Sequence, residues 1–323
     1  MIHPNKHISL ISPYALASLK PPAGKQLVSL SQNESLRPPS PRAISAASNA
    51  IASAQLYPDP DWNALRQTLA DLHNISAGEI LIGNGSMELI LCITLAFCDK
   101  YGAILAPRHA YPFFKTAAQI ARARYDTSPE RKEGVCVDSL LDAVKPNTRI
   151  VFVANPGNPT GTFISRSQVL RLREGLRDDI LLVIDEAYGE FVDHLEQQVF
   201  DLVKRGDTVV LRTFSKAYGL AGMRIGWGLF PKLVRSATRK LINPNNVSVA
   251  GQAAALAALR DQTYMIETCN IISNLRDSFV KRLKKVGFNM QQSFTNFSLI
   301  QFANSEIANS ADKALRAEGV FFR

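Results

Sequence analysis

Lys216 stands among residues whose side chains suit covalent chemistry with an aldehyde. The segment from Thr213 to Gly226 reads TFSKAYGLAGMRIG. A lysine amine that is kept partly neutral can form a Schiff base with an aldehyde. The hydroxyls of Thr213 and Ser215 and the guanidinium of Arg224 can hold a phosphate. A ligand that carries both groups suggests pyridoxal phosphate, whereas Ser-x-Lys alone would indicate only a surface lysine in a glycine-rich loop.

Asp185 ends an apolar run that starts at Ile180. Five successive apolar residues predict a buried parallel strand. Ligands of open α/β sheets bind at the carboxyl ends of such strands, so Asp185 is placed to meet one. An aspartate at this position can also cap a helix, and the residue alone does not decide between the two roles.

Two turns also follow apolar runs and could contact a ligand. The turn Gly83–Ser86 precedes a helical pattern, and free N–H groups at the start of a helix bind phosphate. The turn Asn155–Gly161 (NPGNPTG) ends a second run, because proline removes a donor and glycine allows unusual φ. Each turn alone is also an ordinary end of a strand.

Together these segments, in this order, closely resemble the aminotransferases of pyridoxal-phosphate fold type I. The resemblance implies that Lys216 forms the Schiff base and that Asp185 pairs with the protonated pyridine nitrogen of the cofactor. It also implies that Asn158 and Tyr188 share the phenolic oxygen of the ring. The fold implied is α/β, with a large domain built on a mostly parallel sheet flanked by helices and a smaller α+β domain.

The resemblance assigns further cofactor contacts. It implies a phosphate cup formed by Gly85, Ser86 and Met87, although many members carry an acidic residue where Met87 stands. An aromatic side chain is needed to stack on the ring, and the register favours Tyr111 over its neighbours, with His109 a loop residue beside the site. The motif Tyr57-Pro58-Asp59 implies that Tyr57 reaches the phosphate of the neighbouring subunit, which predicts a homodimer with shared active sites.

The subgroup that the chain most resembles is histidinol-phosphate aminotransferase. The resemblance rests on Ser31–Ser35 (SQNES), Asn246–Ser248 (NVS) and Thr295–Ile300 (TNFSLI). It implies that Asn33 and Arg323 contact the substrate. Members of the subgroup continue past the segment that matches Glu318–Arg323 and carry their main substrate arginine there, so the C-terminus is expected to be shortened.

The function predicted is transfer of an amino group between an amino acid, or histidinol phosphate, and a 2-oxo acid such as 2-oxoglutarate. Two alternatives within the fold remain open: decarboxylation of a phosphorylated amino acid of the threonine-phosphate type, and cofactor binding without turnover. A nucleic-acid-binding module is a third alternative. The formal charge of +9 favours it, but the basic residues are scattered, and positive charge equally suits an anionic cofactor and substrate.

The pattern of apolar runs predicts the organisation of the 323-residue chain. We expect an N-terminal arm over residues 1–48, a large cofactor-binding domain over 49–243 and an incomplete small domain over 244–323. A long helix is predicted from Val249 to Leu283, followed by a strand at 297–302. Apolar runs alternating with helical stretches predict the strands of the large domain, at 80–83, 103–106, 149–154, 180–185, 208–213 and 225–230.

Composition and cysteine spacing indicate where in the cell the protein is expected. No apolar run of about 18 residues is present, so neither a membrane span nor membrane binding is expected, and the N-terminus lacks the apolar stretch of a signal peptide. Four cysteines, Cys92, Cys98, Cys136 and Cys269, lack paired metal-ligand spacing. They predict reduced thiols in a cytoplasmic protein without a metal site.

Overall fold

A seven-stranded sheet forms the centre of the computed structural model, which describes residues 2–12, 19–131 and 134–322. Arg323 therefore lies outside the described residues. The strands are β1 (Val28–Ser29), β2 (Ile80–Gly83), β3 (Ala103–Pro107), β4 (Arg124–Ser128), β5 (Thr148–Ala154), β6 (Leu181–Asp185), β7 (Thr208–Thr213), β8 (Gly226–Leu229) and β9 (Val320–Phe321). The helices are α1 (Pro41–Ile51), α2 (Asn63–His73), α3 (Ser86–Phe97), α4 (Pro112–Ile120), α5 (Val137–Asp142), α6 (Arg166–Gly175), α7 (Lys232–Arg239), α8 (Val249–Leu259), α9 (Gln262–Lys285) and α10 (Ser305–Ala317).

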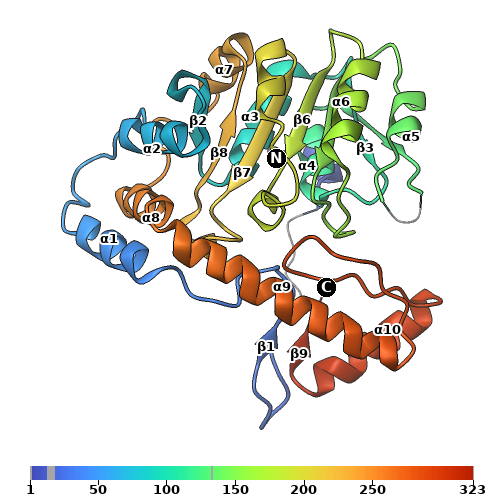
Figure 1. Cartoon of the computed structure of the whole chain (residues 1–323). Coiled ribbons are helices and arrows are strands. Elements are labelled where there is room, and N and C mark those ends of the chain that lie inside the picture. Colours follow the sequence, from blue (N-terminus) through green and yellow to red (C-terminus); the bar gives the residue numbers. More distant parts are fainter. Residues whose placement is uncertain (1, 13–18, 132–133, 323) are drawn as a thin grey trace.

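The sheet has the order β2-β8-β7-β6-β5-β3-β4 and is parallel except at β8, which runs antiparallel to both of its neighbours. Helices cover both faces, with α3 and α4 on one side and α6 on the other (Figure 1). Burial on both faces explains why β3, β5, β6 and β7 are nearly continuous apolar runs. The predicted α/β class and the mostly parallel sheet are confirmed, and the six predicted strands lie within one or two residues of the expected bounds.

The strand β4 was not predicted. Its sequence, RYDTS, is mostly polar, only Ser128 in it is buried, and the strand pairs only with β3 at the edge of the sheet. A polar edge strand has no apolar run to signal it, because one side of it faces solvent.

Two predictions for the C-terminal region are wrong. The helix predicted from Val249 to Leu283 is broken between Leu259 and Gln262, where Asp261 leaves the helical region with φ −120° and ψ 53°. Aspartate favours such positions at the start of a helix over the helix interior. The segment 297–302 is also not a strand. The hydroxyls of Ser293 and Thr295 donate to the carbonyl of Phe297 (2.5 and 3.2 Å), which fixes a turn in place of an extended ladder.

Strands from the two terminal regions of the chain, β1 and β9, meet in the smaller lower body in Figure 1, which also contains α10 and most of α9. There β1 and β9 form a two-stranded parallel sheet, with Val28 opposite Val320. The segment that follows β1 runs up to the edge of the large sheet and into α1, which packs against α8. Residues near the N-terminus are therefore placed by elements from the other end of the sequence.

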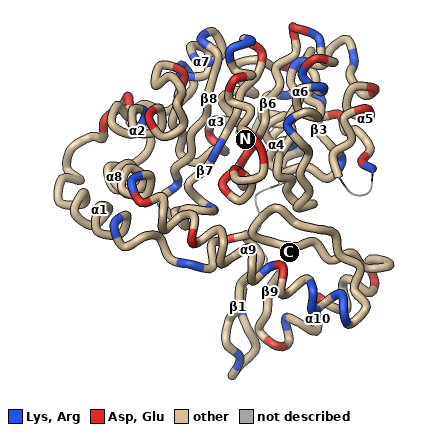
Figure 2. The backbone as a smooth tube through the Cα atoms, in the orientation of Figure 1, with Lys and Arg blue, Asp and Glu red and all other residues tan. Residues whose placement is uncertain are grey.

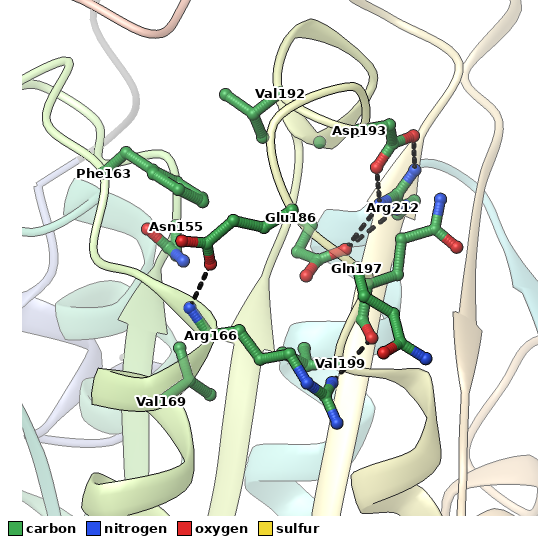
Figure 3. Close-up of a pocket in the computed structure, with 13 residues that line it drawn as sticks. Asn155, Phe163, Arg166, Val169, Glu186, Val192, Asp193, Gln197, Val199 and Arg212 are labelled. Atoms are coloured by element: carbon green, nitrogen blue, oxygen red, sulfur yellow. Dashed lines mark hydrogen bonds and ion pairs between the residues drawn. The ribbon is translucent and has the colours of Figure 1, made fainter.

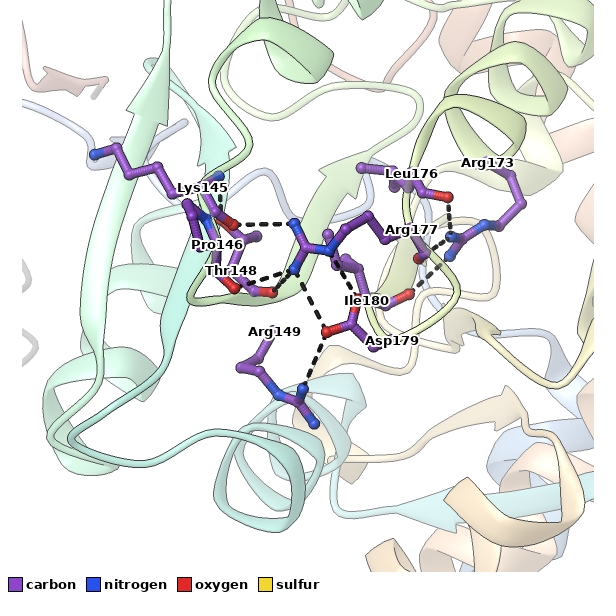
Figure 4. Close-up of polar contacts among 9 residues, drawn as sticks. All are labelled: Lys145, Pro146, Thr148, Arg149, Arg173, Leu176, Arg177, Asp179 and Ile180. Atoms are coloured by element: carbon purple, nitrogen blue, oxygen red, sulfur yellow. Dashed lines mark hydrogen bonds and ion pairs between the residues drawn. The ribbon is translucent and has the colours of Figure 1, made fainter.

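Two arginines brace the amino ends of the central strands (Figure 4). The guanidinium of Arg173 is fully buried and donates to the carbonyls of Leu176, Arg177 and Ile180 at 2.8–3.1 Å. Arg177 donates in turn to three carbonyls at the start of β5, those of Lys145, Pro146 and Thr148. These bonds satisfy carbonyls that helix α6 and the loops leave without partners. They lie at the edge of the sheet opposite the carboxyl ends, and we assign them a structural role.

Figure 2 shows basic residues distributed among acidic ones along α2, α6 and α10. In the part of the chain that the structure describes, no helix is long and apolar enough to cross a membrane.

Candidate active site

A cavity of about 560 Å³ opens at the carboxyl ends of β5, β6 and β7, where polar residues follow each strand. Most of the residues predicted from the sequence line it together: Asn33, Ser86, Met87, Tyr111, Asn158, Asp185, Tyr188, Thr213, Ser215, Lys216 and Arg224. Three predicted residues are placed differently. Gly85 lies beside the cavity at the start of α3, Tyr57 is 84% exposed on the loop after α1, and Arg323 is not described.

The Lys216 side chain reaches into this cavity from the loop after β7. Its Nζ atom donates to the main-chain carbonyls of Gln32 (3.1 Å) and Asn33 (2.8 Å). Burial lowers the pKa of Lys216 to about 8, with Glu34 acting in the opposite sense and Arg224 adding to the decrease. A lysine with this pKa has a substantial fraction of neutral, nucleophilic amine near neutral pH.

Asp185 lies at the end of β6, on the floor of the cavity, and is buried. Burial raises the pKa of Asp185 to about 7, while a hydrogen bond from the Ala187 N–H (3.2 Å) lowers it. A carboxylate in this environment is stabilised by a cationic partner placed next to it. The carboxyl group is therefore suited to pair with a protonated ring nitrogen.

The start of α3 forms an anion site that depends on two glycines. Gly85 has φ +79°, and a Cβ atom there would lie 2.6 Å from Nη2 of Arg224. A Cβ atom on Gly226 would lie 2.4 Å from the Ser86 nitrogen, so β8 can approach the helix this closely only with glycine. The helix N-terminus, the Arg224 guanidinium and the hydroxyls of the β7 loop thus converge on one space.

The side chains of Thr213 and Ser215 are held in place by hydrogen bonds between these two residues. The Thr213 hydroxyl donates to Ser215 Oγ (3.0 Å) and accepts from the Ser215 N–H (3.1 Å). Both side chains line the cavity. A phosphate would find these donors already oriented, which reduces the entropy lost on binding.

Aromatic rings form the walls of the cavity. The Tyr188 hydroxyl accepts from Asn33 Nδ2 (3.2 Å), and its ring meets Phe297 edge to face at 5.4 Å. Burial raises the pKa of Tyr188, so this phenol stays protonated and can donate. Tyr111 packs against Phe114 at 5.7 Å and turns its ring toward the same cavity.

Several residues of the site were missed from the sequence. Ser31, Gln32 and Glu34 line the cavity beside Asn33, and Asn296 binds the same segment from outside. The SQNES motif was the available signal, but it gave no reason to select its main-chain carbonyls. His109 is not among the residues that line the cavity; it pairs with Glu130 at 2.5 Å.

Arg212 anchors a buried ion network beside the strand that carries Asp185 (Figure 3). The guanidinium is 1% exposed and donates to Glu186 (2.7 and 2.9 Å) and to both oxygens of Asp193 (2.7 Å each). Glu190 approaches at 3.7 Å. Because neighbouring residues in a strand point to opposite faces, Glu186 and Arg212 lie behind the sheet while Asp185 and Thr213 face the cavity. The network thus fixes β6 to β7 directly behind the site.

Glu190 should make the stability of the fold depend on pH. Its Oε2 atom is buried without a hydrogen-bond partner, and burial raises its pKa to about 8, against the effect of Arg212. A carboxyl group with a raised pKa stabilises the fold below its ordinary pKa, and this contribution is lost as the pH rises through about 8. We expect Glu190→Gln to gain stability over wild type between about pH 6 and pH 9, on the order of 3 kcal/mol, measured by urea unfolding.

The matched control is Glu174→Gln, at an exposed carboxyl on α6. Its free energy of unfolding should stay close to that of wild type, because the side chain is exposed. Parallel curves for Glu190→Gln and wild type would contradict the assignment of a protonated Glu190.

The residues present fit pyridoxal phosphate. The cavity holds an amine with a lowered pKa, a buried carboxyl without a strong cation partner, and an anion site that a Cβ atom at Gly85 would obstruct. Among the described residues, no group of His, Cys, Asp and Glu could hold a metal ion.

Comparison with known proteins gives one family. Residues 25–323 match the family described as aminotransferase class I and II. A histidinol-phosphate aminotransferase of Rhodospirillum centenum is 37% identical over 99% of this chain and 89% of its own length. A histidinol-phosphate aminotransferase of Zymomonas mobilis is 38% identical over 98% of this chain and 88% of its own length.

A solved structure supports the same relationship. The histidinol-phosphate aminotransferase of Sinorhizobium meliloti, in complex with pyridoxal-5'-phosphate, superposes with a TM-score of 0.89 at 30% identity. The match covers 93% of this chain and 83% of that one. The chain thus belongs to the class I and II aminotransferases, enzymes of fold type I that use pyridoxal phosphate.

Proposed function

We propose that this aminotransferase takes the amino group of histidinol phosphate and passes it to a 2-oxo acid such as 2-oxoglutarate. The observation that supports the reaction most directly is the cavity in which Lys216, Asp185 and Arg224 meet. The choice of donor is supported by the relatives from Rhodospirillum centenum and Zymomonas mobilis, both named histidinol-phosphate aminotransferases.

Bound pyridoxal phosphate would supply an electron sink next to the carbon that bears the substrate amine. In the proposed site, Asp185 pairs with the ring nitrogen, and Asn158 and Tyr188 bind the phenolic oxygen. Ring stacking is assigned to Tyr111.

The phosphate is assigned to the N–H groups at Gly85, Ser86 and Met87, to the hydroxyls of Thr213 and Ser215, and to Arg224. These donors surround the start of α3, where the helix dipole favours an anion. Asn33 and Arg323 are kept as proposed substrate contacts.

Lys216 would serve as the general base and acid. A base is most effective when its pKa lies near the working pH, and burial lowers the pKa of Lys216 to about 8. The amine would take up a proton from the donor carbon, hold it at Nζ and release it again as the acid. The carbonyls of Gln32 and Asn33 hold the protonated amine between these transfers.

The family favours transamination over the decarboxylation of a phosphorylated amino acid. Cofactor binding without turnover is the remaining alternative, and the experiment below separates it.

We further propose a homodimer in which Tyr57 serves the neighbouring site, because its exposed ring lies on the loop after α1 and outside the cavity of its own chain. A cytoplasmic location is supported by the cysteines, which are all free. The division into an arm (1–48), a large domain (49–243) and a small domain (244–323) is part of the same proposal.

The test uses the full chain loaded with pyridoxal phosphate. Histidinol phosphate, phenylalanine and glutamate are added one at a time while the visible absorbance of the cofactor is followed. We expect histidinol phosphate to bleach this absorbance and 2-oxoglutarate to restore it. Bleaching by another donor alone would reassign the substrate, and absorbance that no donor changes would favour binding without turnover.

A further inference from the structure

Four residues after β1, Ser31–Glu34, lie against the cavity and form what we call the strap. All four line the cavity. The carbonyls of Gln32 and Asn33 accept both described hydrogen bonds of Lys216 Nζ. The strap therefore provides the acceptors for the lysine amine when Lys216 is not attached to the cofactor.

The strap is held on its other side by Asn296. The Nδ2 atom of Asn296 donates to the carbonyls of Asn33 (3.0 Å) and Glu34 (3.1 Å). The carbonyl of Asn33 thus accepts from Lys216 and Asn296 together. Asn33 itself has φ 52°, in the left-handed region, which asparagine adopts more readily than most residues other than glycine.

Asn296 is well placed to fix this segment. It lies in the turn 293–297, where Arg276 Nη1 donates to the Thr295 carbonyl (2.8 Å). The N–H of Phe294 donates to the carbonyl of Gly161 (2.7 Å), which ties the turn to the NPGNPTG loop beside the cavity. The turn, and with it Asn296, is therefore anchored to the large sheet independently of the strap.

We propose that Asn296 is a positioning residue that acts on Lys216 through the strap, by fixing the Asn33 carbonyl, one of the two that receive the lysine ammonium, and the Glu34 carbonyl next to it. This inference rests on the proposed role of Lys216. Without the amide donor, the strap carbonyls lose their fixed position, and the charged form of Lys216 loses stabilising hydrogen bonds. The neutral amine then becomes more abundant, although it is less well aligned for proton transfer.

The test measures the amine in the cofactor-free, full-length protein. Trace acetic anhydride labels neutral amines, and peptide mass spectrometry gives the labelling rate of Lys216 between about pH 6 and pH 10. For Asn296→Ala, we expect labelling about five- to tenfold faster near neutral pH and a profile shifted to lower pH, the effect of losing a hydrogen bond to a charged group. Asn296→Ser, whose hydroxyl is too short to reach both carbonyls, should behave alike and is used if the alanine variant does not fold.

The matched control is Asn304→Ala. Asn304 caps α10 by accepting from the Ile307 N–H (2.9 Å), and in the described part of the chain it makes no hydrogen bond to the strap. Its Lys216 profile should equal that of wild type. Folded Asn296 variants whose profile overlays wild type would overturn the inference. If the labelling profile of wild-type Lys216 equals that of the exposed Lys232, the role proposed for Lys216 as a base is wrong. That outcome appears in the wild type itself, so it can be distinguished from a failure of the inference about Asn296.

Discussion

Lys216→Ala is expected to abolish transamination, with a loss of at least about 10⁴-fold in kcat. Proton transfer by a positioned base alone contributes about 10²–10⁴-fold, and alanine also removes the amine proposed to attach the cofactor. The variant should still bind pyridoxal phosphate through the contacts proposed for Asp185, Arg224 and the start of α3, because none of them involves the lysine. Reduction of the loaded protein with borohydride, followed by peptide mass spectrometry, should show no cofactor on this segment.

The control for this prediction is Lys232→Ala. Lys232 is exposed at the start of α7, and its loss removes the same charge without touching the cavity. Full activity is expected. Retention of more than about one-hundredth of wild-type activity by Lys216→Ala would show that another group transfers the proton.

Arg212→Met is expected to lower the free energy of unfolding by about 3–5 kcal/mol, the range measured when one partner of a buried ion pair is removed. The methionine would leave Glu186 and Asp193 buried without the guanidinium that now donates to both. The substitution also removes the cation–π contact between the guanidinium and Phe200, whose ring centre lies 5.0 Å away. Urea unfolding near neutral pH measures the change.

Two further variants test whether the loss of stability comes from the buried charges. Arg205→Met removes an exposed arginine near Asp207 and should cost less than about 1 kcal/mol. Adding Glu186→Gln and Asp193→Asn to Arg212→Met should recover part of the loss, because the uncompensated charges are then gone. A similar cost for Arg205→Met and Arg212→Met would contradict the role assigned to the buried network.

The central strands and the main site residues could be predicted because their signals are local. Apolar runs mark β5, β6 and β7, and Asp185 and Lys216 follow directly in sequence, so strand prediction places them at one edge of the sheet. The motifs that flank the lysine and the aspartate also resemble those of one enzyme family, and this resemblance assigns a role to each of the two residues.

Other features depend on contacts between distant residues and have no local signal. The turn at Ser293–Phe297 replaces a predicted strand through side-chain bonds to the backbone. The break in the predicted helix is a change of backbone conformation at Asp261. The strap is assembled by Lys216 and Asn296, which lie far from it in sequence. Arg212 breaks an apolar run, and this was the one indication that a buried ion network stands behind the site.

The pairing of Val28 with Val320 has a consequence for biosynthesis. A chain that leaves the ribosome from its N-terminus can form the large sheet, including Lys216, before the partner of β1 has been translated. During that interval β1, just ahead of Gln32 and Asn33, lacks its pairing strand, and the lysine amine has no fixed acceptors. We therefore expect the nascent enzyme to complete its cofactor site only after β9 has been translated, once the large sheet has formed.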